Sequence, residues 1–180
     1  MLRALGPSAS LTLAGVSLRA AVDADRPFLE TLYRSVRWDE LASSGWTEEA
    51  RLAFLTSQFD FQQRHYAIAL PGAEFYVIEA ESRPIGRIYV DRTTSELHLA
   101  ELSLLPQWRG RGVGGALVAM LQDEVRAGRA TCVTLNVERT NPGARRLYER
   151  LGFVATPDAL PYPGISIEMA WPARPAGPAS

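Results

Sequence analysis

The feature that most constrains this chain is a glycine-rich turn between an apolar strand and an apolar helix. Four glycines fall within six residues, namely Gly110, Gly112, Gly114 and Gly115. The strand before them ends at Pro106, which cannot donate to a β ladder, and a helix rich in alanine, leucine and valine begins at Val113. A strand, a tight turn and a helix in direct succession are typical of an α/β fold.

The same turn predicts a site for an anion. Glycines leave backbone N–H groups uncovered, and the amides at a helix N-terminus carry a partial positive charge. Arg109 and Arg111 add guanidinium groups that form charge-assisted hydrogen bonds. A pyrophosphate group matches this set of donors.

Three interpretations of the turn compete. The segment 110–115 fits the dinucleotide pattern G-x-G-x-x-G, but it follows a predicted hairpin about two thirds along the chain rather than opening a doubly wound sheet. A tight structural turn explains one or two glycines, but not four beside two arginines. The third interpretation is a loop that binds the pyrophosphate of coenzyme A.

Composition and charge exclude several classes of protein. The chain has 180 residues, with 19 basic and 20 acidic side chains and a formal net charge of −1. Such a chain has no overall attraction to phosphate backbones or anionic lipids, so we expect neither a nucleic-acid partner nor a membrane partner. The two histidines and one cysteine show no metal-ligand spacing, and we expect no metal.

The ends of the chain differ in composition from its middle. Gly6 and Pro7 interrupt a weak apolar run, so we expect residues 1–10 to form a flexible leader. Residues 11–171 form the predicted single domain, and the proline-rich residues 172–180 form a disordered tail. A cytoplasmic location is therefore expected.

Apolar periodicity and turn residues predict a mixed α/β domain in the order β-α-α-β-β-β-α-β-α-β-β. The expected strands lie at residues 11–19, 74–81, 85–91, 96–105, 131–137, 153–156 and 165–171. The expected helices run from Asp23 or Asp25 to about Val36, from Thr47 to about His65, from Val113 to about Ala127, and from Asn141 to about Leu151. Gly152 is expected to close the last helix as its C′ residue.

Two segments resemble the signatures of the GNAT superfamily of acyl-CoA-dependent N-acetyltransferases. The residues at 109–114 read R-G-R-G-V-G and match the pyrophosphate signature Q/R-x-x-G-x-G/A. The residues at 141–153 resemble the pattern N-x-x-A-x-x-L-Y-x-x-x-G-F, in the order that the family has. The resemblance implies a central mixed sheet, mostly antiparallel, of six to seven strands that splay at a bulge, with about four flanking helices.

The resemblance also implies acetyl-CoA as the co-substrate. The backbone of Leu102, Ser103 and Leu104 would pair with the pantetheine arm and polarise the thioester carbonyl. Asn141 would cap its helix or hydrogen-bond the pantetheine. The pyrophosphate would lie against Arg109, Gly110, Arg111, Gly112, Val113, Gly114 and Gly115.

Transfer of an acetyl group to an amine requires an uncharged nitrogen, because an ammonium group has no lone pair to attack with. The resemblance gives Tyr148 the role of general acid at the departing thiolate, with Leu147 and Leu151 expected to supply the core face of its helix. Some relatives carry a base at the position matched by Asn136, which cannot accept the proton. Glu101 is therefore the expected base, because it precedes the pantetheine-pairing residues and shares a strand face with Leu99 and Ser103.

Other features leave the function open. His98 is the reserve base, and a non-catalytic acyl-CoA-binding module on the same fold is the alternative function. Family members often form homodimers, so a homodimer is possible here. Polar and aromatic residues on the first two helices are candidates for the side that binds the acceptor amine. They are Arg34, Arg37, Trp38, Asp39, Glu40, Trp46, Gln58, Phe59, Gln62, Gln63, His65 and Tyr66.

Overall fold

The computed structural model describes residues 15–157 and 164–172, and these residues form two compact units that interleave along the chain. The first unit comprises residues 1–89 and 101–114, and the second comprises residues 90–100 and 115–180. The predicted leader, most of the predicted tail and residues 11–14 of the expected first strand lie outside the described residues. The single domain predicted for residues 11–171 stays a prediction.

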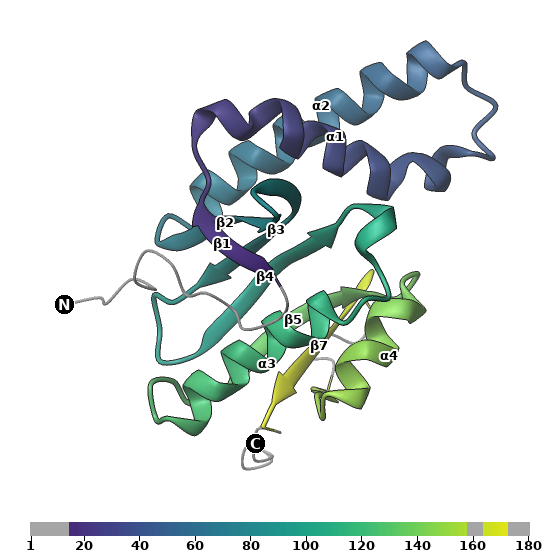
Figure 1. The fold of residues 1–180 in the computed structure, drawn as a ribbon. Helices are drawn as coiled ribbons and strands as arrows, with labels where there is room; N and C mark the ends of the chain where they lie inside the picture. The colour runs from purple at the N-terminus through teal and green to yellow at the C-terminus, as the bar shows by residue number, and fades with distance from the viewer. Residues whose placement is uncertain (1–14, 158–163, 173–180) are drawn as a thin grey trace. The chain divides into compact units, whose positions relative to one another are not determined.

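Seven strands form a sheet in the order β1-β2-β3-β4-β5-β7-β6. Antiparallel ladders join β1 to β2, β5 to β7 and β6 to β7, whereas β4 and β5 are parallel. The mixed, mostly antiparallel sheet of six to seven strands is thus confirmed, while its splay at a bulge stays a prediction. The strands are Val16–Ala20, Ala73–Ala80, Arg83–Asp91, Leu97–Leu104, Val133–Glu138, Val154–Ala155 and Ser166–Trp171, numbered β1 to β7 (Figure 1).

Strands β1 and β2 of the first unit pair from Val16 with Ala80 to Ala20 with Tyr76. The turn between β2 and β3 was expected at residues 82–84, but it lies at Glu81 and Ser82, whose φ angles are 50° and 61°. Positive φ at both central residues is the geometry of a two-residue hairpin that matches the twist of its strands. Pro84 therefore lies in β3 and not in the turn.

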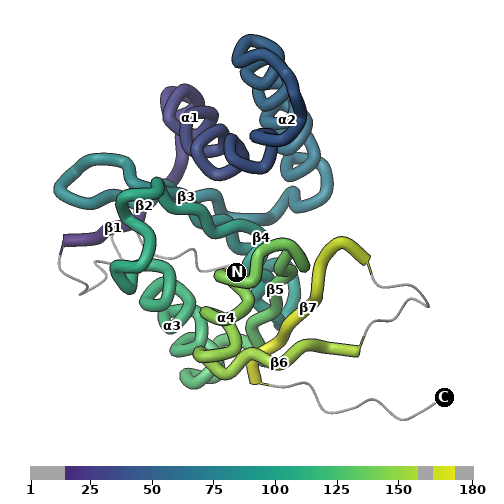
Figure 2. Tube along the Cα trace, turned by 90° about the vertical axis from the view of Figure 1, so that its right-hand side faces the viewer, coloured from purple at the N-terminus to yellow at the C-terminus, as the bar shows by residue number. Residues whose placement is uncertain are grey.

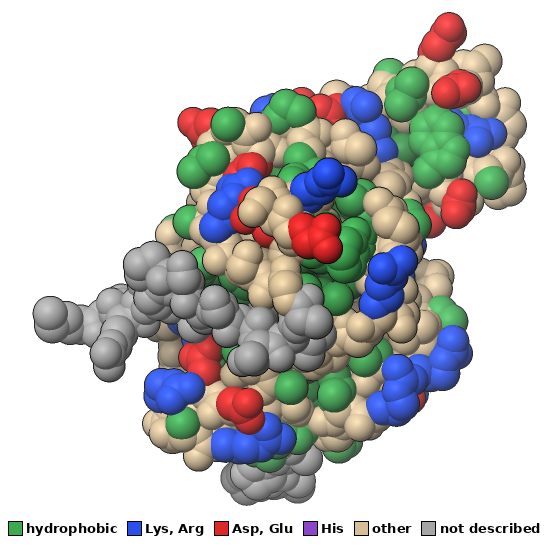
Figure 3. All heavy atoms as spheres, in the orientation of Figure 1, with side chains coloured by type: hydrophobic (Ala, Val, Ile, Leu, Met, Phe, Trp, Pro, Cys, Tyr) green, Lys and Arg blue, Asp and Glu red, His purple; other side chains and the backbone are tan. Residues whose placement is uncertain are grey.

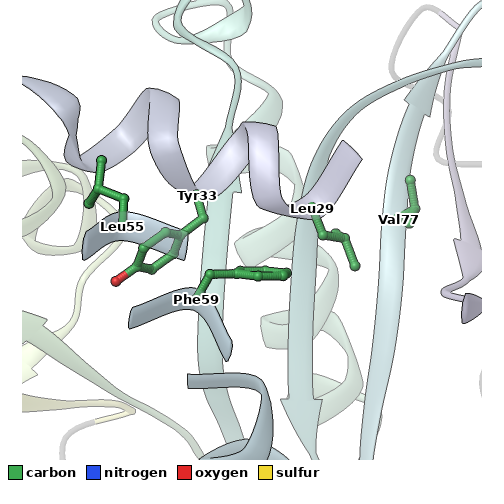
Figure 4. Packing of buried hydrophobic residues seen from close by; sticks show 5 residues of the cluster. All are labelled: Leu29, Tyr33, Leu55, Phe59 and Val77. Carbon is green, nitrogen blue, oxygen red and sulfur yellow. The ribbon is translucent and has the colours of Figure 1, made fainter. Parts of the chain in front are cut away.

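Two helices pack on the first unit's strands. Helix α1 is Arg26–Arg37 and α2 is Glu48–Ala69, four residues longer at its C-terminal end than the expected limit at His65. The two helices run side by side in both views (Figures 1 and 2). Their contact is a cluster of buried side chains that reaches β2, namely Leu29, Tyr33, Leu55, Phe59 and Val77 (Figure 4).

The second unit contains most of helix α3 (Val113–Arg126) and all of α4 (Pro142–Arg150). The antiparallel ladder of β5 with β7 runs from Val133 with Trp171 to Glu138 with Ser166. Gln122 of α3 donates to the carbonyl of Leu151 at 2.8 Å and so ties α3 to the end of α4. The four principal helices lie within two residues of their predicted bounds, except that α2 ends four residues later and that α1 starts one residue after Asp25 and three after Asp23.

Charged side chains of both signs are interspersed over much of the face shown in Figure 3. Basic side chains gather where α4 lies, a helix that carries Arg145, Arg146 and Arg150. Within the described ranges, no helix combines the length and apolar character needed to cross a membrane.

Candidate functional site

The turn after β4 takes its shape from glycine. Strand β4 ends at Leu104, before Pro106 as predicted, and a short 3-10 helix spans Pro106–Trp108. Gly110 and Gly112 then adopt φ angles of +72° and +83°, the left-handed region that favours glycine. A Cβ atom at either position would meet no heavy atom within 4 Å. The backbone of this turn is therefore uncovered, as an anion-binding loop requires.

The glycines of the turn are not equivalent. Val113 is buried and begins α3, while Gly114 and Gly115 follow it with ordinary helical backbone. A Cβ on Gly115 would lie 3.8 Å from the side chain of Leu147, which is an ordinary contact. The left-handed conformation therefore requires glycine at Gly110 and Gly112. Gly114 and Gly115 leave part of the first turn of α3 without side chains.

The two arginines of the turn have intramolecular contacts. Arg109 Nε donates to the carbonyl of Leu104 at 3.0 Å, which fastens the turn to the end of β4. The guanidinium of Arg111 lies 5.2 Å from the ring centroid of Trp108. Both side chains are exposed. Their predicted contact with a pyrophosphate stays a prediction, and Arg109 has a structural role that the sequence did not reveal.

Glu101 is the centre of a polar cluster inside the first unit. Its Oε2 accepts a hydrogen bond from the Tyr66 hydroxyl at 3.0 Å and lies 3.4 Å from Nη2 of Arg87. Its Oε1 accepts a hydrogen bond from the Ser103 hydroxyl. The shared strand face of Glu101 and Ser103 is thereby confirmed. The side chain of Glu101 therefore has three polar neighbours, Tyr66, Arg87 and Ser103.

Arg87 is the most unusual member of the cluster, because arginine is almost never fully buried unless it is paired. The residue is 2% exposed, and its Nη2 also donates to Gln62 Oε1 at 2.9 Å. Its Nε and Nη1 have no hydrogen-bond partner among the described residues. Its guanidinium stacks on the ring of Tyr89 at 5.1 Å. Glu101 supplies the countercharge that this buried cation needs.

Tyr66 stays protonated next to Glu101. Burial raises the pKa of the Tyr66 hydroxyl well above its ordinary value, and the nearby negative charge of Glu101 raises it further. The hydroxyl therefore remains a donor to the carboxylate throughout the physiological pH range. Tyr66 and Gln62, two of the residues proposed for the acceptor side, thus converge on Glu101 and Arg87.

Close approach of β3 to β4 depends on Gly86. A Cβ at this position would lie 2.4 Å from the carbonyl oxygen of Ser103 and 2.7 Å from Leu104 Cδ2. No side chain fits such a space without a shift of the backbone. Gly86 thus fixes the position of two of the residues predicted to pair with pantetheine.

The second unit holds the other predicted site residues. Tyr148 is 8% exposed and packs on Phe153 with ring centroids 5.8 Å apart. Leu147 and Leu151, which were expected to supply the core face of α4, are only half-buried, and Tyr148 is the most buried residue of that helix. The proton-donating role of Tyr148 stays a prediction.

Asn141 caps α4, since its side chain accepts a hydrogen bond from the Ala144 amide at 3.0 Å. Gly152 ends the helix with φ +85°, as predicted for a C′ glycine. His98 Nδ1 lies 3.0 Å from the Thr134 hydroxyl. The capping role is confirmed, and a pantetheine contact of Asn141 stays a prediction.

Several other acceptor-side candidates have partners of their own. Phe59 is 1% exposed and belongs to the core between α1 and α2. Arg34 pairs with Glu30 and donates to Thr56. Arg37 and Glu40 form an exposed ion pair at 3.1 Å. These contacts assign Phe59 to the core and Arg34, Arg37 and Glu40 to ion pairs within their own segment of the chain.

Sequence reasoning missed Arg87 and Gly86. Arg87 alternates with Ile85 and Tyr89 on one face of β3, and both neighbours are almost fully buried. An arginine at an inward-facing strand position signals a buried countercharge, and this signal was present in the sequence. Gly86 had no such signal, because only the structure shows how closely β4 passes. Among the described residues, no group of three or more histidine, cysteine or acidic side chains is arranged to hold a metal.

Comparison with known proteins identifies a family. Residues 35–153 match the model of the acetyltransferase (GNAT) family. The chain is 27% identical over 143 residues to the uncharacterized N-acetyltransferase YhfO of Bacillus subtilis. The matched region covers 77% of this chain and 89% of that protein. It is 33% identical over 88 residues to an uncharacterized N-acetyltransferase of Methanocaldococcus jannaschii. That matched region covers 44% of this chain and only 38% of that protein.

Solved structures share the fold at low sequence identity. The PaiA N-acetyltransferase of Thermoplasma acidophilum, solved in complex with coenzyme A, superposes with a TM-score of 0.63 at 18% identity, over 86% of this chain and 97% of that one. An acetyltransferase of Thermus thermophilus gives a TM-score of 0.62 at 15% identity, over 86% and 95% of the two chains. These likenesses confirm the architecture described above.

Proposed function

We propose, because this chain belongs to the acetyltransferase (GNAT) family, that it transfers the acetyl group of acetyl-CoA to a primary amine. Membership of this family confirms the predicted GNAT superfamily and the predicted class of enzyme, an acyltransferase. The observation that carries the more specific proposal is the turn after β4. Two left-handed glycines with open space beside them lead directly into the N-terminus of α3.

The proposed site binds the pyrophosphate of acetyl-CoA at this turn. Backbone N–H groups of residues 110–115 and the positive end of α3 supply the electrostatic attraction. Arg109 and Arg111 are exposed and add positive charge beside the turn. The PaiA structure contains coenzyme A, which supports an acyl-CoA as the co-substrate. The main chain of Leu102, Ser103 and Leu104 is proposed to pair with the pantetheine arm.

Transfer proceeds by direct attack in a ternary complex of enzyme, acetyl-CoA and amine. Glu101, an anionic acceptor with Arg87 as countercharge, takes one proton from the ammonium group, directly or through water. The nitrogen lone pair attacks the thioester carbonyl carbon, and a C–N bond forms. A main-chain amide near Leu102 stabilises the oxyanion. The C–S bond then breaks with its electron pair on sulfur, and the nitrogen releases its second proton to solvent, from which the group that protonates the thiolate is restored.

The departing thiolate is proposed to take its proton from the Tyr148 hydroxyl. This assignment depends on the resemblance of residues 141–153 to the family pattern and on the position of Tyr148 in it. Replacement by phenylalanine keeps the packing on Phe153 and removes only the hydroxyl. Tyr148→Phe should therefore lower kcat more than it raises the KM for acetyl-CoA, and an unchanged kcat would remove the role.

Calorimetry with coenzyme A, followed by a thiol-release assay with acetyl-CoA and a panel of amines, tests the proposed function. The panel includes a peptide N-terminus, a lysine peptide, a polyamine and free amino acids. We expect saturable binding and thiol release with at least one amine. Binding without release by any amine would instead favour the non-catalytic acyl-CoA-binding module. No binding would overturn the proposal. A cytoplasmic location and a homodimer stay predictions.

A further inference from the structure

The two oxygens of the Glu101 carboxylate have unequal surroundings. Oε2 accepts a hydrogen bond from the Tyr66 hydroxyl at 3.0 Å and also lies 3.4 Å from Nη2 of Arg87. Oε1 accepts from the Ser103 hydroxyl, and among the described residues it has no second donor. A carboxylate offers about four acceptor positions, two on each oxygen. The position that stays open is therefore on Oε1.

The carboxylate of Glu101 is less enclosed than the cation that pairs with it. The side chain of Glu101 is 17% exposed, whereas that of Arg87 is 2% exposed. Ser103 follows Glu101 by two residues on β4 and is half-buried. Its main chain belongs to the segment that is proposed to pair with the pantetheine arm. Oε1 is thus the carboxylate oxygen in contact with the segment proposed to hold the thioester.

The donors on Oε2 keep their protons. Burial, and then the charge of Glu101, raise the pKa of the Tyr66 hydroxyl, and a guanidinium stays protonated in proteins. Arg87 is also held by Gln62 at 2.9 Å and by the ring of Tyr89. In a neutral carboxylic acid, the carbonyl oxygen accepts two hydrogen bonds and the other oxygen carries the proton. Two donors on Oε2 match the carbonyl oxygen, so a proton that arrives belongs on Oε1.

The position of the Ser103 hydroxyl depends on the backbone of β4. A Cβ at Gly86 would lie 2.4 Å from the Ser103 carbonyl oxygen, so β3 and β4 are in close contact at this point. A carboxylate only accepts hydrogen bonds, so the Ser103 hydroxyl donates its one proton to Oε1. This bond restricts the rotation of the Glu101 side chain, and a small displacement of a reacting group lowers the rate of reaction.

We propose that Ser103 is a positioning residue, whose hydroxyl presents Oε1 of Glu101 as the atom that takes the ammonium proton. In this step an N–H bond of the acceptor breaks and an O–H bond forms on Oε1. The electron pair stays on the nitrogen, so the amine and the carboxyl group both become neutral. Ser103 can continue to donate, because the protonated oxygen keeps a lone pair. This role rests on the proposed acetyl transfer with Glu101 as the base.

Thiol-release kinetics of the full chain test this role, with acetyl-CoA and the most active amine of the panel. Ser103→Ala should lower kcat about 10- to 100-fold and leave the KM for acetyl-CoA unchanged, because the main chain of β4 remains. Ser103→Thr keeps a hydroxyl and suits a strand, so it should restore most of kcat. Ser103→Cys has a weak donor and should fall between the two. A serine with a merely structural role would not follow this order of donor strength.

Two further variants test the assignment to Oε1. Ser17→Ala is the matched control, because Ser17 is the other serine in a strand of the first unit, and it should leave kcat unchanged. Tyr66→Phe removes a donor from Oε2, where Arg87 remains. It should therefore lower kcat less than Ser103→Ala does.

Equal kcat values for Ser103→Ala and the wild-type chain, no recovery in Ser103→Thr, or a larger loss in Tyr66→Phe would overturn the role of Ser103. The proposed function would survive these results, since the wild-type chain still releases thiol. An unaffected Glu101→Gln variant would overturn both the base and the role of Ser103, whereas no thiol release by the wild-type chain would overturn acetyl transfer itself. If Ser103→Ala does not fold, the threonine and cysteine variants are compared, and equal kcat values would refute the role.

Discussion

The glycine-rich turn and the cluster around Glu101 are neighbours in sequence but are built in opposite ways. The turn takes its shape from residues inside it, through the left-handed backbone of Gly110 and Gly112. The cluster draws its members from α2, β3 and β4, and its Tyr66–Glu101 hydrogen bond joins residues 35 positions apart. One region is encoded by local backbone preference, and the other by tertiary contact.

This difference predicts different responses to substitution. A change in the turn should act on the backbone of that segment and little else. A change in the cluster should disturb several partners at once, because Glu101 accepts from Tyr66 and Ser103 and is paired with Arg87.

The largest expected effect is that of Glu101→Gln. An amide cannot accept the ammonium proton, and loss of a general base lowers kcat by about 10² to 10⁴. The dependence of kcat/KM on pH should also change, because the group proposed to take the ammonium proton is gone. Steady-state thiol release from pH 5 to 9 measures both quantities.

Asp123→Asn is the control for this substitution. Asp123 is likewise paired with an arginine, Arg126 at 2.6 Å, but both side chains are more than half exposed on α3. It should leave kcat and the pH profile unchanged. If Glu101→Gln behaved like Asp123→Asn, the cluster would be structural and Glu101 would not be the base.

Gly86→Ala should have the next largest effect. The new Cβ would lie 2.4 Å from the Ser103 carbonyl, so β3 and β4 must move apart, at a cost of about 3 kcal/mol in the free energy of unfolding. Urea denaturation measures this cost, and the KM for acetyl-CoA should rise with it. In the control Gly143→Ala, the nearest atom would be Asn141 Oδ1 at 3.7 Å, an ordinary contact. Equal stability of the two variants would contradict the close approach.

The contrast also explains how much of the site could be predicted from the sequence. The turn, the start of α3 at Val113, the Asn141 cap and the C′ role of Gly152 are local features, and the structure confirms them. The face shared by Glu101 and Ser103 follows from strand alternation and is confirmed as well.

The partners of Glu101 could not be predicted in the same way. Arg87 and Tyr66 meet Glu101 only once α2 lies on the sheet, and no local pattern fixes which turn of a 22-residue helix reaches which strand. Tyr148 was misjudged for a related reason. Helical spacing placed Leu147 and Leu151 toward the core, but the contact with Phe153 beyond the helix buries Tyr148 more deeply.

Gly112→Ala tests the local side of the contrast with a smaller effect. The left-handed backbone costs an alanine about 1 to 2 kcal/mol, while no atom lies within 4 Å to clash with its Cβ. We expect that loss in the free energy of unfolding and a higher KM for acetyl-CoA. Gly115→Ala is the stability control, because its backbone is not left-handed. If Gly112→Ala were as stable as Gly115→Ala, the turn would not depend on its own backbone geometry.

The smallest expected effect concerns Tyr66 at high pH. Burial, and then the charge of Glu101, raise the pKa of its hydroxyl above the ordinary value of 10, so the unfolded chain loses this proton at a lower pH than the folded chain. The stability that Tyr66 contributes is therefore complete below pH 10 and falls as the pH rises above it, by about 1 kcal/mol between pH 10 and 11. Tyr66→Phe should remove this part of the slope in urea denaturation measured against pH. Tyr33, whose pKa is also raised by burial, keeps its own contribution, so the slope should become shallower and not vanish. Equal slopes in the two proteins would mean that Tyr66 is not held beside the carboxylate, and the cluster would then lose the contact that ties α2 to Glu101.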